Sequence, residues 1–195
     1  MRHRFAWTAI LLALLLSGCS EPPQKEIDQA QSAIDAARAA GADKDGVDKD
    51  AAAEYADAAA TLQKAHASVD QRDYRQALNF AIDARQRAVD ATRLVADART
   101  RAEAAYKADA DRATQLETLL RAAEESRVPA HELRDARATL DAARVSLQEA
   151  RRRLDGGNVA EASSVLAEVR EKLDAAVKST ESISQRAKAG KGRRH

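Results

Sequence analysis

Hydrophobic residues recur every three or four positions along most of this chain. The clearest stretches run from residue 133 to 154 and from 159 to 183, with charged residues between the apolar ones. This spacing places the apolar side chains along one face of an α-helix. No useful stretch shows the alternation that is typical of strands. The pattern therefore predicts an all-α protein, an antiparallel helical bundle or coiled coil. The predicted core stripes are Leu133, Ala136, Leu140, Ala143, Leu147, Ala150 and Leu154, then Val159, Ala162, Leu166, Val169, Leu173, Ala176, Thr180 and Ile183.

The same stripes occur twice, 85 residues apart. The turn "DGGN" (155–158) falls on "DQRD" (70–73) at this offset, without a gap. Two alanine-rich heptad stretches can be matched by chance, but a shared turn position favours an internal duplication of one three-helix unit. The paired positions are Leu140 with Tyr55, Ala143 with Ala58, Leu147 with Leu62, Ala150 with Ala65, Leu154 with Val69, Val159 with Tyr74, Ala162 with Ala77, Leu119 with Ile34 and Ala122 with Ala37.

Helix breakers set the predicted boundaries. Gly41 and Gly46 follow the first helix, Asp73 and Asn158 are suited to N-caps, and Pro129 is suited to the first position of a helix. Neither glycine nor proline occurs between residues 74 and 127. We therefore expect one central helix of about 54 residues, or roughly 80 Å, shared by two three-helix units at 26–110 and 111–185.

The composition limits the core that these units can build. The chain has 195 residues, of which 32% are charged and 3% aromatic, and alanine is the main apolar residue. Alanine favours helix but buries little surface. Long helices around a thin core are therefore expected.

The first 18 residues have the layout of a secretory signal. A basic start with Arg2 and Arg4 is followed by an apolar run, residues 5–16, that is too short to span a bilayer comfortably. The segment Leu16-Ser17-Gly18-Cys19 resembles the lipobox of bacterial lipoproteins. The resemblance implies that Cys19 receives a diacylglycerol, that the signal peptide is cut off before it, and that its new amine is acylated. An uncleaved membrane anchor with a chance cysteine is the alternative.

The predicted cellular location of the protein follows from this resemblance. Several acyl chains, at about 0.8 kcal/mol per buried methylene, make an effectively permanent anchor. Ser20 stands where an aspartate commonly signals retention in the inner membrane of Gram-negative bacteria. The absence of aspartate at this position favours the periplasmic face of the outer membrane. Residues 19–25 are then the lipidated cysteine and a short tether, which keeps the folded body close to the membrane.

The hairpin turns carry a second resemblance. The segments "DQRDYRQALNFAIDARQRAVDA" (70–91) and "DGGNVAEASSVLAEVREKLDAA" (155–176) resemble the "GDY-x-x-A" turn-helix of an uncharacterised family of bacterial envelope lipoprotein domains, and the turn is similar to that of tetratricopeptide helices. The segment "AAAEYADAAATLQKAHASV" (51–69) is similar to the middle helix of that family. Such domains often precede an OmpA-like peptidoglycan-binding domain, which does not follow here, so we expect no wall binding by that route.

The net charge of +1 hides an uneven distribution. The stretch between the signal and residue 186 carries a net charge of about −6, whereas residues 186–195 are basic without an acid. This tail is predicted to be flexible, and its arginines suit phosphate groups. It is a candidate anion-binding segment, and a plain soluble tail is the alternative. The basic residues are Arg186, Lys188, Lys191, Arg193 and Arg194.

The other polar motifs predict no catalytic site. The segment "GADKDGVDKDA" (41–51) resembles an acidic calcium loop, but Gly41 and Ala52 stand where an EF-hand needs its first and twelfth ligands. A loop whose Asp48 or Asp50 caps the next helix is favoured instead. His66 and His131 have no partners spaced as metal ligands, and both are expected on exposed helix faces.

The sequence thus favours a non-enzymatic outer-membrane lipoprotein that acts as a periplasmic helical scaffold, spacer or protein-binding module. A protein partner in the envelope is expected, without a cofactor, a metal or a nucleic acid. The alternative is a binding protein for an anionic envelope polymer, lipopolysaccharide or cell wall, that uses its basic tail.

Overall fold

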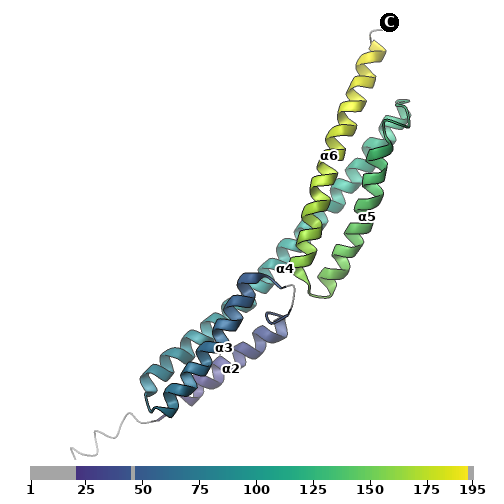
Figure 1. Ribbon diagram of the computed structural model, residues 1–195. Helices are drawn as coiled ribbons and strands as arrows, with labels where there is room; N and C mark the ends of the chain where they lie inside the picture. The colour runs from purple at the N-terminus through teal and green to yellow at the C-terminus, as the bar shows by residue number, and fades with distance from the viewer. Residues whose placement is uncertain (1–20, 45–46, 193–195) are drawn as a thin grey trace, which may run out of the picture.

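The computed structural model describes residues 21–44 and 47–192 and contains five helices in these ranges, without a strand (Figure 1). The all-α fold is therefore confirmed. The helices are α2 (Gln24–Ala40), α3 (Lys49–Asp70), α4 (Tyr74–Glu125), α5 (Arg134–Asp155) and α6 (Val159–Gly192).

The helices form two three-helix units that share α4. In unit 1, α2 and α3 pack against the first half of α4, and in unit 2, α5 and α6 pack against its second half. The 52 residues of α4 span about 78 Å. The molecule is therefore a rod, with the first described residues at one end (the tether end) and the end of α6 at the other (the far end), as Figure 1 shows. The predicted shared central helix is confirmed.

Polar caps and left-handed residues begin and end these helices. The side chain of Asp48 accepts hydrogen bonds from the backbone of Asp50 and Ala51, and Asp73 accepts one from Gln76. These carboxylates satisfy N–H groups that the first helical turn leaves without partners. Gly41, at φ 93°, ends α2 in the left-handed conformation that glycine adopts at little cost. The predicted caps at Asp48 and Asp73 are confirmed.

The two hairpin turns are built alike, as the duplication predicts. In 70–73 and in 155–158, three backbone N–H groups donate to carbonyls of the preceding helix in the same order, 85 residues apart. Arg72 (φ 60°) and Gly157 (φ 83°) occupy the same left-handed position. Helices α3 and α5 also begin and end 85 residues apart. The second and third helices of the units therefore correspond at the predicted offset.

The predicted offset is wrong by one residue in the first helix of each unit. The left-handed residue after that helix is Gly41 in unit 1 and Arg127 in unit 2, an offset of 86. The loop that follows is thus one residue shorter in unit 2. The buried residues that correspond are Ile34 with Leu120 and Ala37 with Ala123, in place of the predicted partners Leu119 and Ala122.

Pro129 does not open a helix, which corrects another prediction. Helix α5 begins at Arg134, and the Pro129 carbonyl instead accepts a hydrogen bond from Glu132 within a turn. This turn allows Val128 before it and Leu133 after it both to be buried. Burial of these two side chains accounts for the later helix start.

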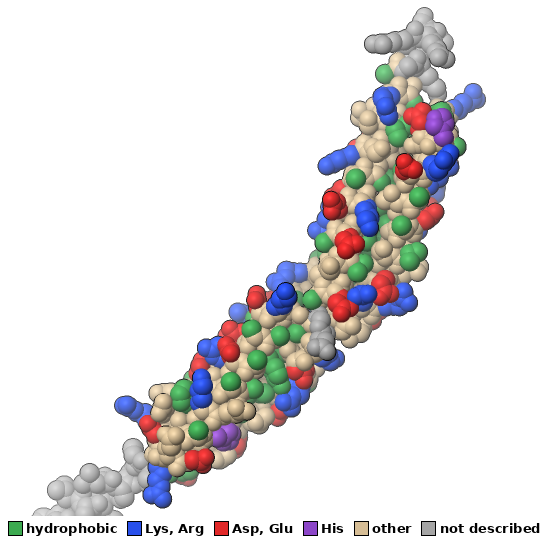
Figure 2. Space-filling model, viewed as in Figure 1, with side chains coloured by type: hydrophobic (Ala, Val, Ile, Leu, Met, Phe, Trp, Pro, Cys, Tyr) green, Lys and Arg blue, Asp and Glu red, His purple; other side chains and the backbone are tan. Residues whose placement is uncertain are grey.

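All fifteen residues of the predicted core stripes in unit 2 are buried. Unit 1 is built differently, because its core is mostly alanine with Ile27, Ile34 and Leu62 as the large side chains. On the face seen in Figure 2, basic and acidic side chains are interspersed along both units. The rod therefore has a thin core divided into three clusters, one in each unit and one at the joint, and a mixed charged surface on this face.

Candidate functional site

The predicted lipidation site and signal cleavage motif lie outside the described residues. They consist of Leu16, Ser17, Gly18 and Cys19. The first described residue, Glu21, is two positions after Cys19 and lies at the tether end. A lipid on Cys19 would therefore hold the rod by this end.

The predicted basic tail is in part helical, which corrects the expectation of a flexible segment from residue 186. Helix α6 continues to Gly192, because Ala187 still packs against the core of unit 2 and the neighbouring residues favour helix. Arg186 and Lys188 are exposed on this helix and make no ion pair with a described residue. The side chain of Lys191 and the whole of Arg193 and Arg194 lie outside the described part.

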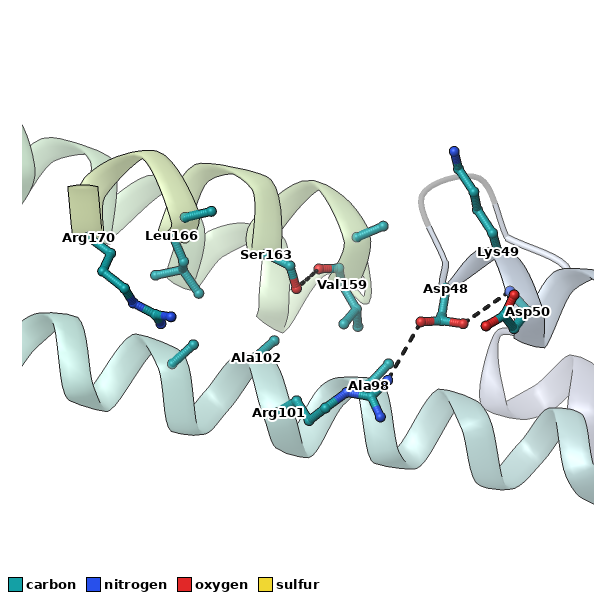
Figure 3. A pocket seen from close by; sticks show the side chains of 13 residues that line it. Asp48, Lys49, Asp50, Ala98, Arg101, Ala102, Val159, Ser163, Leu166 and Arg170 are labelled. Atoms are coloured by element: carbon teal, nitrogen blue, oxygen red, sulfur yellow. Dashed lines mark hydrogen bonds and ion pairs between the residues drawn. The ribbon is translucent and has the colours of Figure 1, made fainter. Parts of the chain in front are cut away.

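A groove of about 630 Å³ lies at the joint between the units, where α3 and α6 both begin on the surface of α4 (Figure 3). Its floor is apolar and narrow, because small side chains of α4 meet the first turns of α6. The groove is thus a product of the placement of three helix segments and not of one local motif. Its floor and wall include Ala98, Ala102, Ala105, Val159, Ser163 and Leu166.

Charged side chains stand at both ends of this groove. At the α3 end, Arg101 lies 3.7 Å from Asp48, while the labelled Lys49 points away from the groove. At the other end, the guanidinium of Arg170 points toward α4. A Cβ on Gly157 would lie 3.8 Å from Lys44 Nζ, so the α2–α3 loop and the α5–α6 turn also adjoin here. The loop of unit 1 and the turn of unit 2 thus lie close together at the joint, beside the part of α4 that both units share.

A buried carboxylate behind the groove positions Arg170. Asp109 is fully buried in α4, and its Oδ1 accepts hydrogen bonds at 3.1 Å from both Arg112 Nη1 and Arg170 Nε. Arg112 Nε also donates to Asp174 at 2.8 Å. Asp109 Oδ2 is buried without a hydrogen-bond partner among the described residues. This cluster links α6 to α4 through the Arg170–Asp109 and Arg112–Asp174 contacts.

Sequence reasoning missed this cluster, although a signal was present. Residues 102, 109, 113 and 116 step by seven, four and three, so Asp109 stands in a core position of α4. A charge in such a position needs a partner from another helix. The partner Arg170 could be identified only with the register of α6 in hand.

A second charged cluster bridges α3 and α4 in unit 1. Arg87 Nη1 lies 3.2 Å from Glu54 and 3.3 Å from Asp57, and its Nε donates to Asp83 at 3.3 Å. The hydrogen bond to Asp83 raises the pKa of the Arg87 guanidinium above its ordinary value. These groups are open to solvent, so the cluster has the features of a surface network.

The remaining polar candidates are the two histidines and the acidic loop between α2 and α3. His66 is exposed on α3, as predicted, whereas His131 is exposed in the turn before α5 and not on a helix face. Asp48 caps α3, and Asp45 and Gly46 of the acidic loop lie outside the described residues. In the described ranges, no group of three or more His, Cys, Asp and Glu side chains is arranged to hold a metal ion. No described helix is both long and apolar enough to cross a membrane.

The groove is lined by both apolar and polar side chains. It combines an apolar floor with the N–H donors of Arg101 and Arg170, and its one hydroxyl, Ser163, donates to the Val159 carbonyl at 2.9 Å.

Comparisons with protein-family models, with curated proteins and with solved structures found no match.

Proposed function

We propose that this protein is a non-enzymatic, lipid-anchored helical scaffold of the bacterial cell envelope. In this proposal Cys19 carries the lipid on the periplasmic face of the outer membrane, and the rod holds a binding surface away from the anchor. The resemblance of residues 16–19 to a lipobox is the reason for the membrane assignment.

The observation that carries the proposal is the position of the two ends. The tether and the end of α6 lie at opposite ends of a rod through which α4 runs without a break. A continuous helix resists bending far better than two bundles joined by a flexible linker. Such a shape supports a spacer or scaffold role, since it fixes the distance between an anchor and a contact.

The anchor is tested with Cys19→Ala. We expect this variant to take up no radiolabelled palmitate and to accumulate as an uncleaved precursor, because the thiol is the acyl acceptor. Ser20→Ala is the matched control and should be lipidated and processed normally. Palmitate in the Cys19→Ala protein would contradict the proposal.

The scaffold role is tested with photo-crosslinking side chains in intact cells. Position 145 is suited to this, because Val145 is 65% exposed on α5 and distant from the tether end. We expect a discrete crosslinked protein that is lost when Cys19→Ala misplaces the rod. A crosslinker at position 66 near the tether end is the control. Equal products from both positions would argue against presentation by unit 2.

The second candidate function is binding of an anionic envelope polymer through the basic tail. Arg186 and Lys188 favour it, because both are exposed at the far end without an ion pair to a described residue. They are two residues apart on a helix and thus lie on different faces, which weakens a combined site. Arg186→Ala with Lys188→Ala should reduce co-sedimentation with isolated cell wall if this function holds.

A further inference from the structure

One face of α4 in unit 1 combines exposed apolar side chains with arginines. It consists of Arg75, Leu78, Ile82, Arg85 and Val89, which step by three and four along the helix and are called the outer face here. Ile82 is 45% and Val89 51% exposed. Three large hydrophobic residues are exposed in the described ranges, and Ile82 and Val89 are two of them. They lie one heptad apart on α4. Exposed apolar residues that gather on one face indicate a contact surface.

The arginines of this face are not neutralised by acidic side chains. Arg75 makes no ion pair with a described residue, and Arg85 donates to the neutral Gln29 side chain of α2 at 2.9 Å. The acidic residues on the same stretch of α4 are engaged elsewhere, since Asp83 contacts Arg87 and Asp90 contacts Arg93. Arg85 also lines a shallow hollow with Lys25 and Asp28 of α2. The outer face therefore offers positive charge beside apolar surface.

Unit 2 provides an internal reference for this face. At the offset of 85 residues its counterparts are Ala160, Ser163, Ala167, Arg170 and Asp174. These side chains are smaller or polar, and Arg170 is paired with the buried Asp109. The fold therefore does not require the half-buried Leu78 or the exposed Ile82 and Val89 at these positions. Unit 1 differs from unit 2 in that it lies at the tether end of the rod.

We infer that the outer face of unit 1 rests on the surface of the membrane that holds the lipid of Cys19, with Leu78, Ile82 and Val89 in the interface and Arg75 and Arg85 at anionic headgroups. Apolar and basic side chains that share one helix face are typical of helices that lie in a bilayer interface. This inference rests on the proposed lipid anchor.

The length of the tether supports a lipid surface as the partner. Four residues lie between Cys19 and the start of α2, and the five steps from Cys19 to Gln24 reach at most about 18 Å when fully extended. Helix α2 packs beside the outer face through Gln29 and Arg85. An anchored rod thus keeps this face within reach of headgroups, where arginines are attracted to anionic lipid.

Contact along this face would orient the whole molecule. The outer face runs along the side of unit 1, so unit 1 would lie along the bilayer instead of standing on it. Figure 1 shows the rod axis turning between the units, so that unit 2 does not continue the line of unit 1. Unit 2, whose axis leaves that line, would then not lie along the bilayer in the same way as unit 1.

The test uses the full lipidated chain in vesicles of phosphatidylethanolamine and phosphatidylglycerol. Cys19 is the only cysteine, so in a lipidated protein a fluorophore attaches only to an introduced thiol. We expect the environment-sensitive label at Ile82→Cys and at Val89→Cys to shift its emission to shorter wavelength and to be quenched by spin-labelled lipids. The label at Ala167→Cys, the counterpart of Ile82 in unit 2, should show neither change.

A second variant replaces residues of the outer face of unit 1 by the residues at the equivalent positions of unit 2. Leu78→Ser with Ile82→Ala introduces the residues that unit 2 tolerates at these positions, so the fold should be kept, with unchanged circular dichroism as the check. In the Val89→Cys background we expect this change to abolish the emission shift and the quenching. Phosphatidylcholine vesicles, which carry no net charge, should weaken both signals. High salt should do the same, because it screens the attraction between the arginines and the anionic headgroups.

Each other outcome overturns the inference in a distinct way. If the N-terminal peptide carries the lipid by mass spectrometry but labels at 82 and 167 respond alike, the inference fails and the anchor stands. If Ile82→Cys crosslinks to itself between copies and is shielded without lipid quenching, a second copy covers the face. If the peptide carries no lipid, the proposed function fails and this inference fails with it.

Discussion

The two units have the same helix order and turns but differ in the size of the side chains that fill them. On α4 of unit 1, the positions that face the other helices are Ala81, Ala84 and Ala88, all fully buried. Their counterparts on α6 of unit 2 are Leu166, Val169 and Leu173. Alanine at such positions lets helix axes approach closely, whereas leucine fills a wider space between them. One backbone plan is thus compatible with two ways of packing.

This difference predicts unequal stability. Each buried methylene contributes about 0.8 kcal/mol, so a leucine in place of a buried alanine adds a substantial apolar contribution. Unit 2 should therefore be the more stable half and unit 1 the half that opens first. Hydrogen exchange should show slower exchange in α5 and the first turns of α6 than in α2 and α3.

The largest expected effect comes from removing a large side chain from the core of unit 2. Leu173→Ala deletes a fully buried side chain and should lower the free energy of unfolding by about 2–5 kcal/mol, measured by denaturant unfolding. The exposed neighbour Lys172 provides the control, since Lys172→Ala should change stability by less than about 0.5 kcal/mol. Equal effects of both changes would show that α6 packs by another face.

The next effect tests whether the units are coupled through α4. Ala104 is exposed near the joint, and Ala104→Pro removes a backbone donor and clashes with the preceding turn, at a cost of about 3 kcal/mol or more. We expect a hinged molecule with nearly normal helicity and a shorter maximum dimension in X-ray scattering. A parent protein that already scatters as a compact sphere would rule out the rod.

Much of this fold could be predicted because its signals are local. The heptad stripes and the absence of glycine and proline between residues 74 and 127 are sufficient to predict α4 and the core of unit 2. The one-residue difference between the first loops was not visible, because alanine-rich helices tolerate either alignment. It became apparent only from the left-handed positions of Gly41 and Arg127.

The candidate surfaces were harder to predict because they depend on relative placement. The joint groove exists where the starts of α3 and α6 meet on α4, and no single segment encodes this meeting. Asp109 occupies a core position of α4 and was missed, because its partner Arg170 is 61 residues away on another helix. The helical continuation past residue 186 is not evident from the sequence, because the glycines and the scarcity of apolar residues in this segment indicate flexibility.

A smaller effect is expected from enlarging the core of unit 1. Ala88→Leu introduces the residue that unit 2 carries at the same position, Leu173, into a site without room for it. Overpacking should lower the free energy of unfolding by about 1–3 kcal/mol, although leucine is the more hydrophobic residue. The exposed Ala96 is the control, and Ala96→Leu should be nearly neutral. A stabilised Ala88→Leu variant would mean that unit 1 is loosely packed.

The smallest effect concerns the start of the second helix in each unit. Asp48 caps α3, whereas Leu133 stands at the same place before α5 and offers no side-chain cap. Asp48→Ala should therefore destabilise unit 1 by about 0.5–2 kcal/mol, measured by denaturant unfolding and by faster amide exchange in the first turn of α3.

Asp48 also lies 3.7 Å from Arg101 across the joint, so the cap and the ion pair must be separated. Asp48→Asn keeps an oxygen that accepts hydrogen bonds from Asp50 and Ala51 but removes the charge. Because an exposed ion pair contributes only about 0–1 kcal/mol, we expect the asparagine variant to retain most of the stability. Arg101→Ala should then be nearly as mild. If Asp48→Asn instead loses as much as Asp48→Ala, the contact across the joint and not the cap holds the start of α3, and the units depend on each other more than their separate cores indicate.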